Sequence, residues 1–153
     1  MATLVKLCPI AVLLTVLFAA PLTAAERLPG PFTAEVLRAV DGDTLEVKVS
    51  VWLGLQVNTL VRIRGIDTPE KRGKCPREIE LAQKATELLR IETTPRVVLR
   101  NVEGDKYFGR VDADVTTSPD GLDLSEAMLR SGLARPYAGE KRGDWCGVAS
   151  LTQ

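Results

Sequence analysis

The segment Val61–Glu70, VRIRGIDTPE, concentrates the residue types that phosphate chemistry requires. Arg62 and Arg64 are followed within a few residues by two carboxylates, Asp67 and Glu70. Arginine binds phosphate oxygens through paired hydrogen bonds, and carboxylate oxygens bind the hard divalent cations that polarise a phosphoryl group. The segment therefore predicts one part of a metal-assisted site for phosphate esters.

Two further segments contain complementary groups. Asp41–Thr44, DGDT, lies between two strand patterns, and Asp105–Arg110, DKYFGR, lies on a polar loop between two others. Each segment also has a purely structural interpretation. Asp-Gly is a common hairpin turn, Thr68-Pro69-Glu70 is typical of a helix start, and the downstream loop could bury its aromatic rings. Taken alone, none of these segments identifies a site.

The combined charges favour the functional interpretation. Asp43, Asp67 and Glu70 bring three negative charges, which would repel one another in a cluster. Arg62 and Arg110 offset only two of these charges. A divalent cation would neutralise the remainder, and calcium suits such a site because it accepts few protein oxygens and completes its shell with water and a phosphate oxygen. We therefore expect Ca²⁺ as the cofactor.

The composition narrows the possible chemistry. The chain of 153 residues contains 20 Lys+Arg, 20 Asp+Glu and no histidine. The lack of histidine excludes His general bases, His-dependent nucleophile triads and zinc sites with imidazole ligands. Because the charges balance, any phosphate-binding surface must be local.

The first 25 residues predict a cleavable secretory signal peptide. Lys6 precedes the apolar run Leu7–Ala20, and Thr23-Ala24-Ala25 forms a small-residue cleavage pattern before Glu26. An uncleaved membrane anchor fits less well, because the run is shorter than the ~20 residues of a spanning helix. We expect one domain over residues 26–153, secreted or periplasmic, with no membrane attachment after cleavage.

Two cysteines remain after the predicted cleavage site, Cys75 and Cys146. In an oxidising compartment such a pair forms a disulfide more often than it remains as two free thiols. The bridge would close a long loop and stabilise the fold by about 4 kcal/mol in the chain-entropy model.

Alternating apolar and polar residues predict five short strands, most clearly where Leu45, Val47 and Val49 alternate with polar side chains. Helical spacing follows the third and fifth strands, and Gly132 ends the second helix. Five short antiparallel strands favour a small closed barrel, since closure removes exposed edges. The tail from Arg135 has no regular pattern. The predicted strands are Phe32–Val40, Thr44–Val51, Val57–Ile66, Arg96–Asn101 and Val111–Thr116, and the predicted helices are Glu78–Ile91 and Leu124–Ser131.

The motifs VDGDT, IDTPE with an arginine four residues upstream, DKYFGR and LSEAMLRSGLA together resemble the staphylococcal nuclease (thermonuclease) family in order and spacing. The resemblance covers the chain from Phe32 to Tyr137, and its specificity lies in the ordered set. It implies an α+β fold, a five-stranded OB-fold β-barrel with packed helices. It also implies calcium-dependent hydrolysis of DNA and RNA phosphodiester bonds, with products that end in 3′-phosphate.

The resemblance implies a role for each matching residue. A calcium ion would be held by two carboxylates and a backbone carbonyl, beside a carboxylate that acts on the attacking water as general base or orienter and two arginines that bind the scissile phosphate. The corresponding residues are Asp43, Asp67 and Thr68 for the metal, Glu70 for the water, and Arg62 and Arg110 for the phosphate. Asp41 would be an acid near the metal ligands, and the expected nucleotide contacts are Lys106, Tyr107 and Tyr137. Arg64 has no counterpart role, so we expect it to be a surface charge.

Three features depart from the family pattern. DKYFGR has one residue more than the family's DKYGR, which leaves open whether Tyr107 or Phe108 stacks on the substrate. The loop after IDTPE is shorter and contains Cys75, and the family's long final helix after Tyr137 is absent or reduced to an irregular tail. We expect a disulfide from Cys75 to Cys146 to tie this tail to the active-site loop.

We therefore predict a hydrolase, a calcium-dependent nuclease that acts on DNA, RNA or both as a monomer without a stable protein partner. The alternative is a non-catalytic OB-fold module that binds nucleic acid or protein. Degenerate copies of a barrel normally lose a carboxylate or an arginine of the site, and none is missing here. A third interpretation is an envelope protein that binds calcium for structural reasons. Calcium-dependent cleavage separates the first interpretation from the other two.

Overall fold

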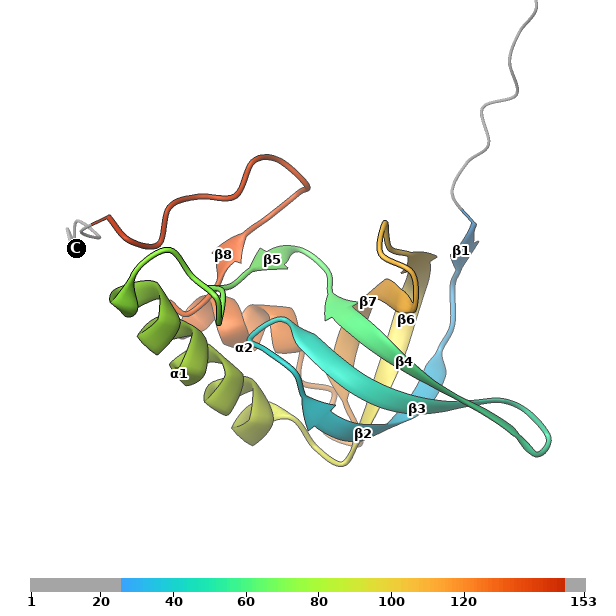
Figure 1. Cartoon of the computed structure of the whole chain (residues 1–153). Helices are drawn as coiled ribbons and strands as arrows, with labels where there is room; N and C mark the ends of the chain where they lie inside the picture. Colours follow the sequence, from blue (N-terminus) through green and yellow to red (C-terminus); the bar gives the residue numbers. More distant parts are fainter. Residues whose placement is uncertain (1–25, 148–153) are drawn as a thin grey trace, which may run out of the picture.

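Five strands close into a barrel, which confirms the predicted barrel with helices (Figure 1). The computed structural model describes residues 26–147, and the predicted signal peptide lies outside the described residues. Around the barrel the strand order is β2, β3, β4, β7, β6 and back to β2. A short strand, β1 (Arg27–Leu28), pairs with β6. The barrel strands are β2 (Phe32–Ala39), β3 (Thr44–Trp52), β4 (Leu55–Ile63), β6 (Arg96–Gly104) and β7 (Arg110–Thr117).

One pairing in the ring is parallel, so the expectation of antiparallel strands throughout is wrong in this detail. β4 and β7 run in the same direction, with Leu60 opposite Arg110 and Ile63 opposite Ala113. A closed ring with an odd number of strands cannot alternate direction throughout, and at least one neighbouring pair must be parallel. Residues 64–109 supply the long connection that parallel neighbours need. This pairing places Arg110, at the start of β7, close to Arg62 on β4.

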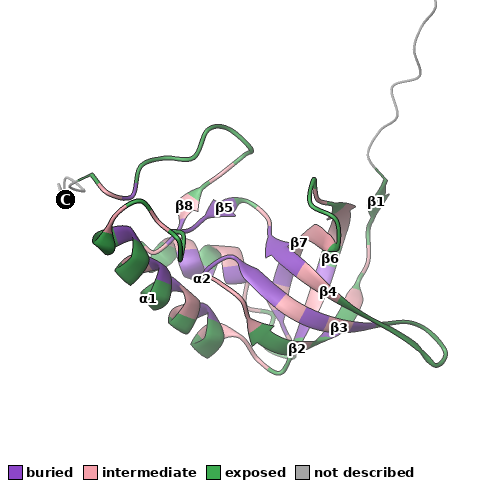
Figure 2. Cartoon of the chain, viewed as in Figure 1, coloured by how far each residue is buried: buried purple, intermediate pink, exposed green. Residues whose placement is uncertain are grey.

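Alternation along β3 and β4 gives the barrel its apolar interior. Leu45 pairs with Val61 across the two strands, and both side chains are fully buried, as are Val47 and Ile63. Burial of one such side chain contributes about 1.5–3 kcal/mol relative to its exposure. At the other end of both strands, the hairpin around Gly54 projects beyond the barrel and its side chains are exposed (Figure 2). The closely packed core therefore lies at the end of the strands that carries the predicted site.

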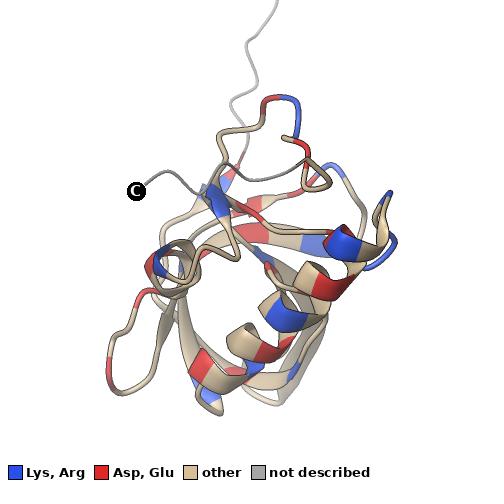
Figure 3. Cartoon of the chain, turned by 90° about the vertical axis from the view of Figure 1, so that its left-hand side faces the viewer, with Lys and Arg blue, Asp and Glu red and all other residues tan. Residues whose placement is uncertain are grey.

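The helix α1 (Pro76–Glu92) covers one end of the barrel (Figure 1). It begins two residues before the predicted start, because Pro76 occupies its first turn and the Cys75 Sγ accepts a hydrogen bond from the Glu78 amide at 3.4 Å. The structure therefore excludes a helix start at residues 68–70. One face of α1 is buried, whereas its outer face carries charges of both signs (Figure 3). No described helix is long and apolar enough to span a membrane.

A second small sheet connects the barrel to the tail. β5 (Ile66–Asp67) pairs antiparallel with β8 (Arg135–Pro136), so the tail contains a short strand that the sequence pattern did not predict. The second helix, α2 (Leu124–Arg130), precedes β8 and lies beside α1. The turn from β4 into β5 depends on Gly65, whose φ of +84° lies in the left-handed region that favours glycine. The small sheet places Asp67 between the barrel and the C-terminal residues.

Candidate active site

The turn before β3 packs closely against the segment that follows β5. A Cβ atom at Gly42 would lie 2.7 Å from the Cβ of Ala85 and 2.9 Å from Oγ1 of Thr68. Glycine is therefore required at this position by the close approach of its neighbours. The contact holds the turn that carries Asp43 against Thr68 and α1, which a simple hairpin turn does not explain.

Asp43 is a buried carboxylate with only 5% of its surface exposed. Thr44 Oγ1 donates a hydrogen bond to Asp43 Oδ1 at 2.8 Å, and Arg62 Nη2 lies 3.4 Å from Oδ2. Burial, and then the neighbouring Asp41 carboxylate, raise the pKa of Asp43 to about 7, while the Arg62 guanidinium opposes the shift. A further positive charge would stabilise the ionised carboxylate, which is the electrostatic condition for a cation site.

Asp67 and Thr68 are also buried, with 3% and 4% exposure. The pairing of β5 with β8 fixes the Asp67 backbone. Asp67 Oδ2 accepts a hydrogen bond from Trp145 Nε1 at 3.2 Å. Asp67 Oδ1 lies 2.9 Å from Arg142 Nε, but no donor among the described residues is aligned for a hydrogen bond to it. Asp67 therefore offers a buried carboxylate oxygen with unfilled bonding capacity.

Glu70 lies on the loop between β5 and α1, with 54% of its side chain exposed. The buried Glu78 holds this loop, because its carboxylate accepts hydrogen bonds from the Lys74 amide at 2.8 Å and the Glu70 amide at 3.4 Å. A Cβ atom at Gly73 would lie 2.5 Å from Cγ of Glu78, so the loop passes close to this side chain. The Glu70 backbone is thus positioned by Glu78, while the Glu70 carboxylate forms an ion pair with Arg142.

Arg62 and Arg110 line one open cleft of about 910 Å³. Arg62 is 8% exposed, and its Nη2 also donates to the Ile66 carbonyl oxygen at 2.9 Å. Arg110 forms an ion pair with Asp105. Burial alone would raise the pKa of Asp105, but hydrogen bonding and charge from Arg110 lower it overall. The cleft also contains Glu70, Lys106, Tyr107, Tyr137 and Arg142.

Tyr107 lines the cleft, whereas Phe108 does not. The Arg110 Cζ lies 4.8 Å from the centroid of the Tyr107 ring, and Lys106 Nζ lies 5.1 Å from the same centroid. Phe108 is fully exposed to solvent. On the other side, the Tyr137 ring centroid lies 5.2 Å from the Cζ of Arg62. Each arginine therefore has a tyrosine beside it, an arrangement suited to a ligand with both phosphate and ring groups.

Arg64 is partly exposed, and it has a structural role that the expectation of a surface charge did not include. Its Nη2 donates to the backbone carbonyl oxygens of Asn101 at 2.6 Å and Asp112 at 3.2 Å, and its Nη1 donates to Asp114 Oδ1 at 3.1 Å. The physical reason is that β4 ends at Ile63, so Arg64 lies in the turn and its side chain reaches across to β6 and β7. Arg62 and Arg64 therefore have separate environments although they are two residues apart.

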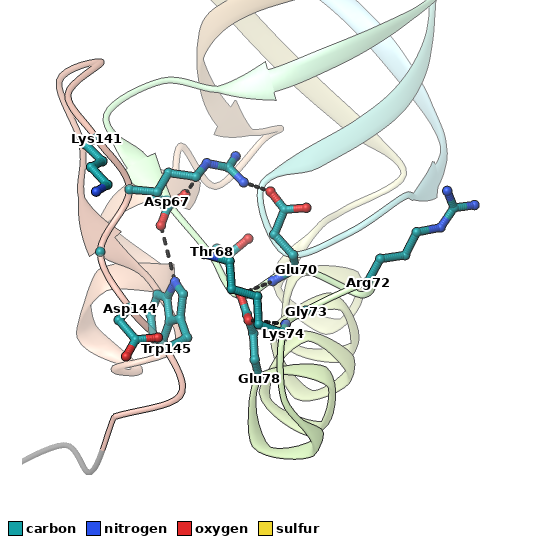
Figure 4. Close-up of a pocket in the computed structure, with 12 residues that line it drawn as sticks. Asp67, Thr68, Glu70, Arg72, Gly73, Lys74, Glu78, Lys141, Asp144 and Trp145 are labelled. Atoms are coloured by element: carbon teal, nitrogen blue, oxygen red, sulfur yellow. Dashed lines mark hydrogen bonds and ion pairs between the residues drawn. The ribbon is translucent and has the colours of Figure 1, made fainter.

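The tail contributes two residues that the sequence pattern did not indicate. Arg142 forms ion pairs with both acids of the IDTPE motif. Trp145 donates the hydrogen bond to Asp67 described above (Figure 4). The structure pairs Cys75 with Cys146 in a disulfide, with Cα atoms 5.9 Å apart. Because the tail has no periodic pattern, its only signal in the sequence was the second cysteine.

The donor set fits a hard divalent cation. Asp43, Asp67 and the Thr68 carbonyl offer oxygen ligands, and one carboxylate oxygen of Asp67 is buried without an aligned donor. Cys75 and Cys146 lie close to Glu78, but their sulfur atoms are bonded to each other and do not offer thiolates to a soft metal. The residues present therefore favour an ion that binds oxygen ligands over a soft, thiolate-binding metal.

Comparison with known families agrees with this architecture. The family described as staphylococcal nuclease homologue matches residues 60–144, more than half of the chain. The matched region includes Arg62, Asp67, Glu70 and Arg110 but begins after Asp43. A search among curated proteins finds no match. Since the matched region also builds the cleft and much of the closed barrel, the chain belongs to the staphylococcal nuclease homologue family.

Proposed function

We propose that this protein is an exported, calcium-dependent nuclease that hydrolyses phosphodiester bonds in DNA, RNA or both. The observation that carries the proposal is one cleft that contains Arg62, Arg110 and Glu70 and lies beside the buried Asp43 and Asp67. Membership of a nuclease family supports the substrate class. The predicted signal peptide and the paired cysteines support export to an oxidising compartment.

In this proposal the buried oxygens hold the cofactor. Asp43, Asp67 and the backbone carbonyl of Thr68 would bind calcium, which when bound supplies Lewis-acid polarisation of the phosphoryl group. Asp41 is a neighbour of the ligand Asp43, because its Oδ1 accepts a hydrogen bond from the Asp43 amide at 3.3 Å. Its negative charge adds to the attraction for a cation.

The remaining residues act on the substrate and on water. Arg62 and Arg110 bind oxygens of the scissile phosphate and stabilise the charge that develops in the transition state. Glu70 accepts a proton from the water whose oxygen forms the new bond to phosphorus. The phosphorus–O5′ bond breaks, the departing oxygen takes up a proton, and the other product keeps a 3′-phosphate. Tyr107 and Tyr137, with Lys106, would contact the nucleotide.

A nuclease assay tests the proposal directly. The purified, oxidised protein should degrade single-stranded DNA or RNA in the presence of calcium, and excess EGTA should abolish the cleavage. Asp67→Asn should have the same effect as EGTA, because it removes a metal ligand and retains the size of the side chain. Protein that is folded by circular dichroism but shows no calcium-dependent cleavage of either polymer would refute the proposal.

One contact favours a second candidate, a non-catalytic module that binds nucleic acid or protein. The Arg142 guanidinium pairs with Glu70, the carboxylate that the nuclease mechanism requires to be free. If this pair persists with calcium and substrate present, the cleft binds a ligand without hydrolysing it. The module predicts calcium-independent retention of an oligonucleotide that is recovered intact, whereas the nuclease predicts its cleavage.

A further inference from the structure

The C-terminal segment of residues 137–146, which we call the strap, crosses the candidate site and is attached at both ends. At its start the Tyr137 amide donates to the Gly65 carbonyl oxygen at 2.9 Å, next to the β5–β8 pairing. At its end Cys146 is bonded to Cys75 on the loop that carries Glu70. Figure 1 shows this segment running across the top of α1 and the small sheet.

Arg142, on the strap, forms ion pairs with the two acids of the IDTPE motif. Its Nε lies 2.9 Å from Asp67 Oδ1, and its Nη1 forms an ion pair with Glu70 Oε1. The Asp67 side chain is 4% exposed and Arg142 is 40% exposed, so the guanidinium covers a buried oxygen from the solvent side. Within residues 26–147 the Arg142 side chain forms no other hydrogen bond or ion pair.

Neighbouring basic residues of the tail are arranged differently. Arg135 donates to the Asp144 carbonyl oxygen at 2.9 Å and lies over the Trp145 ring, so it holds the tail together. Lys141 lines the same pocket as Arg142 but, within the described residues, pairs with no acid. The contact with Asp67 and Glu70 is therefore specific to Arg142 and does not follow from a generally basic tail.

We propose that Arg142 is a built-in competitor for the divalent cation, so that the cation binds only when the guanidinium leaves Asp67 and Glu70. The competition is steric, because Arg142 Nε already lies against Asp67 Oδ1, the oxygen without an aligned donor. It is also electrostatic, because the single positive charge of the guanidinium offsets part of the negative charge on Asp67 and Glu70 that would attract a cation. This inference rests on the metal site of the proposed function but does not require cleavage.

Calcium binding to the oxidised full-length mature protein, measured by calorimetry at low ionic strength, tests the competition. Arg142→Gln should lower the Kd for calcium by about tenfold, within the range usual for coupled sites. Lys141→Gln removes the same charge from the adjacent position and should change the Kd by about twofold or less, because an exposed charge is screened by solvent. Arg142→Lys, which keeps the charge but loses the guanidinium, should fall between wild type and Arg142→Gln.

Thermal unfolding distinguishes competition from simple loosening of the strap. Arg142→Gln should lower the melting temperature in EDTA, because Asp67 and Glu70 lose their partner, yet show a larger calcium-induced rise than wild type. A purely structural role predicts lower stability in both conditions and no gain in calcium affinity. The proposal is overturned if Arg142→Gln binds calcium no more tightly than Lys141→Gln, or if neither variant binds calcium. Loss of cleavage alone would refute the nuclease and leave the competition intact.

Discussion

The candidate site has two halves that are held in place by different forces. In the barrel half, Asp43 directly precedes β3 and Arg62 lies on the neighbouring strand β4. Both residues are almost fully buried, and Arg62 donates a hydrogen bond to Asp43. In the strap half, Glu70 and Arg142 lie on irregular segments, are substantially exposed and are positioned by the buried Glu78 and one disulfide. A continuous apolar core fixes the first half, whereas a few side chains and one covalent bond fix the second.

This difference indicates which half can change during function. Arg62 is held by the register of β4, and a shift of this register would disrupt the barrel core. Arg142 of the strap can move by exchanging its ion pairs with Asp67 and Glu70, because both Arg142 and Glu70 are exposed to solvent. We therefore expect a rigid arginine on the barrel to receive the phosphate, and adjustable groups on the loop and strap to admit the cation and water.

The largest expected effect concerns activity in the strap half. Glu70→Gln should reduce turnover by roughly 10²–10⁴-fold, because it removes the group that takes the proton from water. The melting temperature should stay near that of wild type, since the side chain is 54% exposed. Glu140→Gln is the matched control, because Glu140 lines the same cleft and has no assigned role. Equal turnover of the two variants would remove Glu70 from the mechanism.

In the barrel half, substitution of Arg62 should lower stability as well as activity. Arg62→Ala removes the partner of buried Asp43 and the donor to the Ile66 carbonyl, and breaking a buried pair of this kind costs about 3–5 kcal/mol of unfolding free energy. Arg38→Ala breaks the exposed pair with Glu46 and should cost about 1 kcal/mol or less. Urea unfolding in EDTA measures both. Similar losses of unfolding free energy in Arg62→Ala and Arg38→Ala would mean that the buried contacts of Arg62 stabilise the barrel no more than an exposed ion pair does.

Removal of the disulfide should affect backbone amides in the strap half more than those in the barrel half. The double variant Cys75→Ser, Cys146→Ser should lose about 2–4 kcal/mol of unfolding free energy while keeping the α1 cap, because serine also accepts a hydrogen bond from the Glu78 amide. Hydrogen exchange should then accelerate at Tyr137 and along the strap, with β4 amides least affected. Equal acceleration in β4 would contradict the division into two halves.

The sequence predicted the parts of the molecule that depend on local pattern. Alternation along β3 identified a strand with one buried face, and the ordered motifs identified Asp43, Arg62 and Glu70, which the structure brings to one region. The closed barrel and the family are confirmed. The catalytic, metal-binding and nucleotide-binding roles, the signal peptide and export remain predictions.

The features that the sequence did not reveal depend on contacts between distant segments. The parallel pairing of β4 with β7 follows from ring closure, which no local window contains. The role of Arg64 depends on where β4 ends, and strand boundaries are the least certain part of a pattern. Arg142 and Trp145 lie in a segment without periodicity, so only the three-dimensional path of the strap brings them to Asp67.

The disulfide also has a consequence for the order in which the molecule is completed. Every barrel strand lies before Ser118, whereas Cys146 follows Cys75 by 71 residues. As the chain is synthesised from its N-terminus, all residues of the barrel therefore emerge before the residue that attaches the strap. A barrel with Arg62 and Arg110 already in position can form first, with Asp67 and Glu70 uncovered. Oxidation of the cysteine pair then attaches the end of the strap to the loop that carries Glu70.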